Sequence, residues 1–249
     1  MNLKALISAY VPLDIVEEKK DALFNLLLTL LQKEGVNKDP IVDQLFGFLS
    51  SKENIQAALG WLETGKITVG DAALYDITKT HKLTILKMLF KSKDFQTTDK
   101  MELLELTLGD EKSDLADRTR ATCMASLPDP DVKAQIWKDL TDPNNTESKY
   151  MKDAKKLGFY AHNQIDILAP YFEEFYEILP KMKSQLSGQG FEGWFFGLLP
   201  RMVIEDRHIV KLVALKQDTP ETEKHFQNIL QDGVELLLRS KQIRELSNQ

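Results

Sequence analysis

The chain has 249 residues, of which 43% are hydrophobic, so it is long enough to bury a full core and too apolar to be disordered. Its net charge of −6 argues against a nucleic-acid surface, which needs a basic stripe to displace counterions. A single cysteine, Cys123, permits no intrachain disulfide, and the amino end has no signal-peptide pattern, so we predict a cytoplasmic protein.

The amino-terminal part of the sequence predicts helices that begin at Ser, Thr, Asp or Pro signals and end close to glycine. The amino end itself looks like part of a helix. Further helices are expected from Pro12 to Lys33 with Gly35 beyond it, from Asp39-Pro40 through Leu49, from Ser50 or Ser51 to Gly65, from Lys82 to Lys91, and from Thr97 or Thr98 to Leu108. Between Gly70 and Lys82, residues 72–78 are predicted to form a short helix or a turn.

Residues 111–143 predict a helical hairpin with a tight corner. Ser113 or Asp114 is expected to cap the first helix, and Pro128 ends it. Asp129 followed by Pro130 then predicts a second helix, because the carboxylate caps it and proline gives up an N–H that has no partner. Residues at helical spacing are expected to face each other, namely Leu115, Thr122, Met124 and Ala125 on the first helix and Val132, Ile136, Trp137 and Leu140 on the second.

Aromatic residues gather between positions 159 and 196 and predict a thicker core in the carboxyl-terminal third. A helix from about Asn163 must tolerate Pro170 or break at it, so a kink or a pair of helices is expected. Residues 188–190, Gly-Gln-Gly, are expected to separate that helix from the next segment. Two last helices are predicted, one from Asp206 to Leu215 and one from Thr219-Pro220 towards Leu246.

A helix, a short break and another helix recur along the whole sequence, and almost no alternating strand pattern interrupts them. Degenerate pairs of this kind are typical of α-solenoids, in which each pair buries its apolar face against its neighbours. We therefore predict one all-α domain over residues 1–249, a right-handed HEAT-like or armadillo-like α-solenoid of stacked antiparallel helical hairpins.

Several segments carry a family resemblance, most specifically between positions 110 and 200. They are Lys112-Ser113-Asp114, Ala121, Ala125, Leu127-Pro128-Asp129-Pro130, Lys133, Trp137, Gly158-Phe159, Leu168-Ala169-Pro170-Tyr171-Phe172 and Leu198-Leu199-Pro200. Upstream, Ala57 to Leu62 and Lys82 to Phe95 are similar to preceding repeats. Together they resemble the C-terminal helical domain of zinc aminopeptidases of the aminopeptidase N and puromycin-sensitive type.

The resemblance implies a domain that arches over a catalytic domain, covers the active-site cavity and helps to admit or hold peptide substrates. It also implies that the chain is the C-terminal portion of a larger aminopeptidase. Its expected partners are peptides and a catalytic domain, either in the same polypeptide or in an associated protein.

The zinc-binding motif of such an enzyme does not occur in the sequence. Two histidines separated by Glu-x-x on one helical face, with a downstream glutamate, would hold the metal and activate its water. The four histidines, His81, His162, His208 and His225, never form that spacing. Asp206 and His208 would point to different sides of a helix. We therefore predict no catalytic, cofactor-binding or metal residues here, an inactive isolated chain, and zinc only in the catalytic domain that the resemblance implies.

Five basic residues are candidate contacts for a peptide or a partner. Lys149, Lys152 and Lys156 share one helical face, opposite Tyr150, Ala154 and Leu157, and form a positive strip on an acidic protein. Arg118 and Arg120 line the concave side of the solenoid in one interpretation. In the other, they only pair with Asp114 and Asp117, and the lysines are only a solvated face. The spacing leaves both interpretations open.

The alternative function is that of a stand-alone α-solenoid scaffold that binds a protein partner through its concave surface. We expect no membrane partner, because the most apolar segment, residues 22–31, is shorter than the roughly 20 residues that a membrane helix needs.

Overall fold

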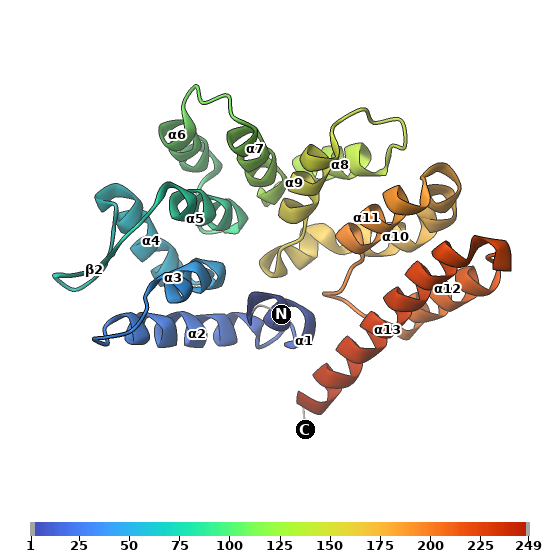
Figure 1. Cartoon of the computed structure of the whole chain (residues 1–249), viewed down its shortest axis with the longest axis horizontal. Helices are drawn as coiled ribbons and strands as arrows, with labels where there is room; N and C mark the ends of the chain where they lie inside the picture. The colour runs from blue at the N-terminus through green and yellow to red at the C-terminus, as the bar shows by residue number, and fades with distance from the viewer. Residues whose placement is uncertain (1–2, 248–249) are drawn as a thin grey trace.

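A computed structural model describes residues 3–247, and these are predominantly α-helical with one small sheet. The helices follow one another around a curved path (Figure 1). Their bounds are α1 Leu3–Tyr10, α2 Val16–Leu31, α3 Asp39–Leu45, α4 Lys52–Thr64, α5 Lys79–Lys91, α6 Thr97–Leu108, α7 Asp114–Ser126, α8 Pro130–Thr141, α9 Lys149–Phe159, α10 Ile165–Gln185, α11 Gly188–Leu198, α12 Asp206–Gln217 and α13 Lys224–Ser247. Short 3-10 turns precede or follow some of them, at Phe46–Phe48, His162–Gln164 and Glu221–Glu223.

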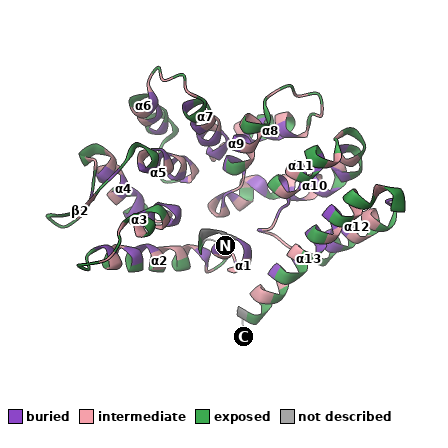
Figure 2. Ribbon diagram, viewed as in Figure 1, coloured by how far each residue is buried: buried purple, intermediate pink, exposed green. Residues whose placement is uncertain are grey.

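Successive helices bury their apolar sides against one another, and Figure 2 shows the exposed sides turned outward. One apolar cluster gathers side chains of α1 to α5, a second lies among α5 to α8, and the largest joins α8 to α13. The third cluster contains the aromatic residues of the carboxyl-terminal third, which confirms the thicker core expected there. None of the described helices is long and apolar enough to cross a membrane.

The path of the chain brings its first and last helices into contact, since α13 packs against α1. Arg244 of α13 ties this junction together: its two terminal nitrogens donate to the carbonyl oxygens of Ala9 at 3.1 Å, Met202 at 2.9 Å and Arg201 at 2.7 Å. We call Arg244, Ala9, Arg201 and Met202 together the seam. The seam fixes the loop between α11 and α12 against the end of α1.

The α7–α8 hairpin confirms the prediction for residues 111–143. The hydroxyl of Ser113 accepts a hydrogen bond from the Ala116 N–H at 3.2 Å. The Asp129 carboxylate accepts bonds from the N–H groups of Asp131 at 2.9 Å and Val132 at 3.1 Å. Ile136, Trp137 and Leu140 are buried as expected. Leu115 is not, because it is 43% exposed, so the inward face of α7 is made by small residues instead, namely Ala116, Thr119, Thr122, Cys123, Ala125 and Ser126.

The prediction of a helix or turn at residues 72–78 is wrong. Strands β1 (Lys66–Val69) and β2 (Ala72–Asp76) pair antiparallel, with Lys66 opposite Asp76 and a turn at Gly70, whose φ is +57°. The β-branched run Ile67-Thr68-Val69 favours a strand, and Ile67 is fully buried. The indole N–H of Trp61 donates to the Thr68 carbonyl at 3.2 Å and holds the hairpin on α4.

Several predicted helix ends also need correction. Helix α2 begins at Val16, not at Pro12, and no side chain caps it. Asp39 lies inside α3, where its carboxylate accepts a hydrogen bond from the Tyr75 hydroxyl at 2.7 Å. Thr97 lies inside α6, which no side chain caps.

In the carboxyl-terminal part, α10 runs unbroken through both Pro170 and Pro180. Apolar residues on both sides of Pro170, such as Leu168 and Phe172, are buried, and this packing stabilises the helix across it. Residues 188–190 form the first turn of α11, not a spacer, because the Ser187 hydroxyl accepts from the Gly190 N–H at 3.2 Å.

A buried lysine joins three of these helices. The ammonium group of Lys133, on α8, donates to the carbonyl oxygens of Ala125 at 2.7 Å and Phe159 at 2.6 Å, near the ends of α7 and α9. Lys133 is fully buried, and burial lowers its pKa to about 7. Lys100 of α6 does the same at the end of α5, where it donates to the carbonyls of Phe90 and Ser92. Both lysines satisfy helix-end carbonyls that would otherwise lack a donor.

Lys133 should make stability depend on pH. Between about pH 7 and 10.5 the unfolded chain holds this proton and the folded chain has released it, so the free energy of unfolding should rise with pH. Urea denaturation of the wild type and of Lys133→Met across this range should show a shallower rise in the variant, which has no amine to titrate. Equal slopes in the two proteins would show that Lys133 stays charged in the fold.

Candidate functional site

The three predicted lysines of α9 lie on the wall of one cavity. Lys149, Lys152 and Lys156 line a space of about 400 Å³ that Trp194 and the first turns of α11 close from the other side. Their spacing of three and four residues places them on one face of the helix, as the sequence predicted. The indole N–H of Trp194 donates to the Leu140 carbonyl at 2.9 Å, which fixes the apolar wall of the cavity.

The three lysines differ in how firmly they are held. Lys156 donates to the Gly193 carbonyl at 2.7 Å and pairs with Asp153 at 2.6 Å. Lys152 donates to the Asn145 carbonyl at 2.6 Å, whereas Lys149 is exposed. Lys156 therefore links α9 to α11, and Lys149 and Lys152 offer positive charge at the mouth of the cavity.

The predicted buried side of α9 needs correction. Tyr150 and Leu157 are each 63% exposed, and only Ala154 of the three expected residues is buried. The buried residues are Ala154, Lys155, Gly158 and Phe159, because α7 and α8 both pack on that side. Lys155 is tolerated there because it pairs with Asp139 at 2.8 Å and Glu147 at 2.6 Å.

Arg118 and Arg120 form the helical ion pairs that one interpretation of the sequence predicted. Arg118 pairs with Asp114 at 2.6 Å and lies over the ring of Tyr150, 5.6 Å from its centre. Arg120 pairs with Asp117 at 3.2 Å and donates to the carbonyls of Gly109 and Glu111. Arg120 thus holds the loop before α7, and only Arg118 stands beside an exposed residue of α9.

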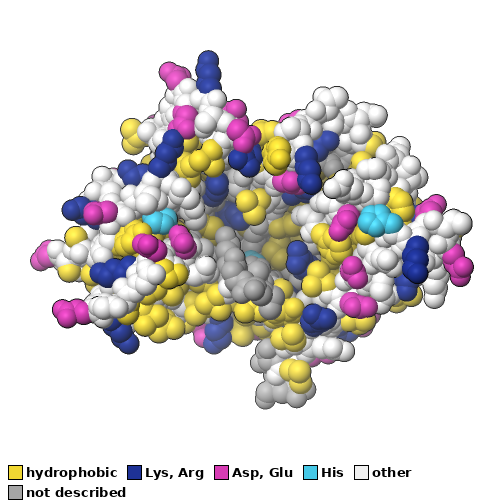
Figure 3. All heavy atoms as spheres, in the orientation of Figure 1, with side chains coloured by type: hydrophobic (Ala, Val, Ile, Leu, Met, Phe, Trp, Pro, Cys, Tyr) yellow, Lys and Arg dark blue, Asp and Glu magenta, His cyan; other side chains and the backbone are white. Residues whose placement is uncertain are grey.

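A second cavity, of about 480 Å³, adjoins the first and shares Asp153, Lys156 and Gly193 with it. Its wall combines residues from α1, α5, α9, α11 and the loop before α12, including Ala9, Lys91, Leu157, Phe196, Arg201 and Met202. Figure 3 shows Lys and Arg side chains on this view of the molecule, interspersed with hydrophobic and acidic side chains. We call the two cavities together the inner basic face.

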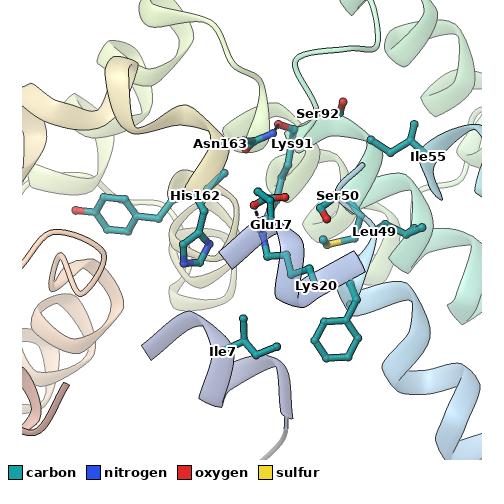
Figure 4. A pocket seen from close by; sticks show the side chains of 15 residues that line it. Ile7, Glu17, Lys20, Leu49, Ser50, Ile55, Lys91, Ser92, His162 and Asn163 are labelled. Atoms are coloured by element: carbon teal, nitrogen blue, oxygen red, sulfur yellow. Dashed lines mark hydrogen bonds and ion pairs between the residues drawn. The ribbon is translucent and has the colours of Figure 1, made fainter. Parts of the chain in front are cut away.

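A smaller cavity, of about 90 Å³, lies next to the second and shares Lys91, Tyr160 and His162 with it. Figure 4 shows Glu17 and Lys20 of α2 at its edge, where they form an ion pair at 2.7 Å. Asn163 donates to the Lys91 carbonyl at 3.1 Å and so fixes the end of α5 beside this space. The three cavities therefore adjoin one another and extend towards the amino-terminal helices.

A separate cluster brings Glu173, Glu205 and His208 within 4.8 Å of one another, so it has the donor types of a metal site. The His208 Nε2 lies 2.6 Å from the Glu173 carboxylate and holds the pKa of Glu173 below its usual range. Arg207 pairs with both Glu173 and Glu205, and Lys211 approaches Glu173 at 3.4 Å. These ion pairs bring cations to both carboxylates and join α10 to the start of α12.

Cys123 was predicted to be a small buried residue, and the structure confirms this. Burial raises the pKa of its thiol to about 12, so it stays protonated and is a poor nucleophile.

A scan against protein-family models finds no match to this chain, and a search of curated proteins finds none either.

Proposed function

We propose that the chain is a non-catalytic helical domain of a zinc aminopeptidase, which covers the active-site cavity and helps to admit or hold peptides. In this proposal the helical hairpins form a right-handed α-solenoid, and the inner basic face is its concave side. The inner basic face is the observation that carries the proposal: an acidic chain gathers Lys149, Lys152, Lys156 and Arg201 around two adjoining cavities.

Two properties of this face suit a peptide. Positive side chains in a concave surface raise the local concentration of a chain that bears carboxylates. The exposed side chain of Leu157 lines the second cavity and would contact the side chains of a bound peptide. In this proposal the face binds and orients the peptide, and the zinc belongs to the catalytic domain that the resemblance implies. The single buried cysteine suits a reducing cytoplasm.

Peptide binding and peptidase activity of the isolated chain test this function. We expect the chain to bind short acidic peptides weakly, with an affinity that falls as salt rises, because screening weakens attraction between charges near the surface. We expect no peptide hydrolysis with added zinc. The double variant Lys149→Gln, Lys152→Gln should bind less than the wild type. Lys19→Gln on α2, whose ammonium pairs with the neighbouring Glu18, removes one positive charge that does not line either cavity and should leave binding unchanged.

Zinc-dependent turnover that a chelator abolishes would show that the chain is itself an enzyme. Absence of any peptide binding by the wild type would contradict the proposed role of the inner basic face.

The alternative function, a scaffold for a protein partner, is favoured by exposed apolar residues away from this face. Leu106 on α6 is 86% exposed and Val210 on α12 is 63% exposed. The reading frame of the gene separates the two functions. An upstream H-E-x-x-H supports the aminopeptidase domain, and its absence from the full frame supports the scaffold.

A further inference from the structure

Arg201 is a partly buried cation of the inner basic face that lacks an acidic counterpart among the described residues. It lines the larger cavity and is half-buried. Among residues 3–247 its guanidinium has no hydrogen-bond acceptor and no ion pair, and Tyr10 is the group that interacts with it electrostatically. Burial also lowers the pKa of Arg201. A planar guanidinium in this state is suited to a bidentate oxyanion.

The neighbours of Arg201 narrow the class of ligand. Lys156 lines the same cavity, but its ammonium is already held by Asp153 and the Gly193 carbonyl. Leu157, Phe196 and Met202 give the rest of the wall an apolar character. A guanidinium without an ion pair beside an apolar wall suits a carboxylate with a hydrophobic group next to it.

The seam fixes the backbone of Arg201. Arg244 donates to the Arg201 carbonyl at 2.7 Å and to the adjacent Met202 carbonyl at 2.9 Å, while its third bond reaches Ala9 at the end of α1. Ala9, Arg201 and Met202 all line the cavity. The wall of the cavity is therefore complete only while the first and last helices are in contact.

We propose that Arg201 binds a carboxylate of a peptide in the cavity of about 480 Å³, and that this binding stabilises the contact between α1 and α13. Arg244 is a positioning residue, because it holds the backbone of Arg201 and does not itself line the cavity. A ligand that binds only while α1 and α13 are in contact shifts the equilibrium towards that state by mass action. The inference rests on the proposed function, since it names the peptide group that the inner basic face receives.

Fluorescence anisotropy with a short peptide that has one aspartate and a free carboxyl terminus tests the binding step. Loss of a charge-assisted, bidentate contact should weaken binding by about ten- to a hundredfold in Arg201→Gln. Arg201→Lys should restore only part of the affinity, because an ammonium cannot make the planar pair. Circular dichroism and thermal unfolding of each variant show whether it is folded.

Two further peptides identify which carboxylate is bound. If the carboxyl terminus binds Arg201, the amidated peptide should bind the wild type as weakly as the original peptide binds Arg201→Gln. If the aspartate side chain binds Arg201, the peptide with asparagine in place of aspartate should bind the wild type as weakly as the original peptide binds Arg201→Gln. Either result supports the inference, whereas equal binding of all three peptides would overturn it.

Hydrogen exchange tests the coupling to the seam. Saturating peptide should slow exchange in residues 3–10 of the wild type, and this protection should be lost in Arg201→Gln. Arg244→Gln should speed exchange in residues 3–10 without peptide and should also weaken peptide binding. Protection of α1 that is unaffected by peptide would overturn the coupling.

The outcomes separate this inference from the proposed function. If Arg201→Gln binds the peptide like the wild type while Lys149→Gln, Lys152→Gln binds less, the inner basic face holds peptides but Arg201 does not receive them. If the wild type binds no peptide, the proposed function fails and this inference fails with it.

Discussion

Trp137→Ala is expected to destabilise the chain by about 3 to 5 kcal/mol, the cost typical of deleting a large buried aromatic side chain. Trp137 is 3% exposed, and its ring lies 5.5 Å from that of Phe159 and 5.2 Å from that of Tyr171. Its indole N–H has no hydrogen-bond partner among the described residues, so the loss is one of packing. The cavity left behind would lie between α8, α9 and α10.

The matched comparison is Asp129→Ala, at the start of the same helix. It removes two hydrogen bonds to helix N–H groups and should cost only about 0.5 to 2 kcal/mol. Urea denaturation of both variants measures the difference. Hydrogen exchange in Trp137→Ala should also increase on both sides of the hairpin, in residues 82–108 and in residues 163–179, because neighbouring helices pack on α7, α8 and α9. Stability near that of the wild type, with unchanged exchange in both segments, would contradict the burial of Trp137.

The α7–α8 hairpin could be predicted because its signals are local. The Ser113 cap, the Asp129-Pro130 start and the spacing of Ile136 and Trp137 act within a few residues of one another. The β-hairpin at residues 66–76 was missed because its weak strand signal depends on support from Trp61 and on burial of Ile67, which only the folded chain supplies. Sequence patterns therefore predicted the structure correctly where residues that are neighbours in space are also neighbours in the sequence.

The same distinction separates the residues of the candidate site. Lys149, Lys152 and Lys156 could be grouped from their spacing on one helix, and they do line one cavity. Arg201 could not be found in this way, because its cavity is completed by Ala9 and Lys91, which are far from it in the sequence. The single weak signal is its position directly after Pro200, in a loop that follows an aromatic helix.

The sequence analysis did not predict the burial of two lysines, Lys133 and Lys155, because charged side chains are seldom fully buried unless they are paired. In the fold, Lys133 satisfies helix-end carbonyls and Lys155 pairs with two carboxylates. Such burial depends on acceptors from other helices, so it becomes visible only when the helices are placed beside one another.

Gly158→Ala is expected to cost about 3 kcal/mol, although alanine is intrinsically the better helix former by about 1 kcal/mol. Gly158 lies where α9 crosses α7, and an added Cβ would overlap the Thr122 carbonyl oxygen and lie 2.9 Å from the Ala125 Cβ. Neither atom can move alone, since one belongs to the α7 backbone and the other is attached directly to it. The two helices would have to separate, which would strain the hydrogen bond of 3.1 Å from the Thr122 hydroxyl to the Ala154 carbonyl.

Gly60→Ala is the matched control for this substitution. Gly60 lies in the interior of α4 with nothing within 4 Å of an added Cβ, so alanine there should stabilise the chain by up to about 1 kcal/mol. Thermal and urea unfolding of the two variants should therefore move in opposite directions. Because α9 also carries Lys149, Lys152 and Lys156, its displacement in Gly158→Ala should weaken peptide binding to the inner basic face, while Gly60→Ala leaves it unchanged. If both variants were stabilised, α7 and α9 would not be in the close contact on which the shape of the inner basic face depends.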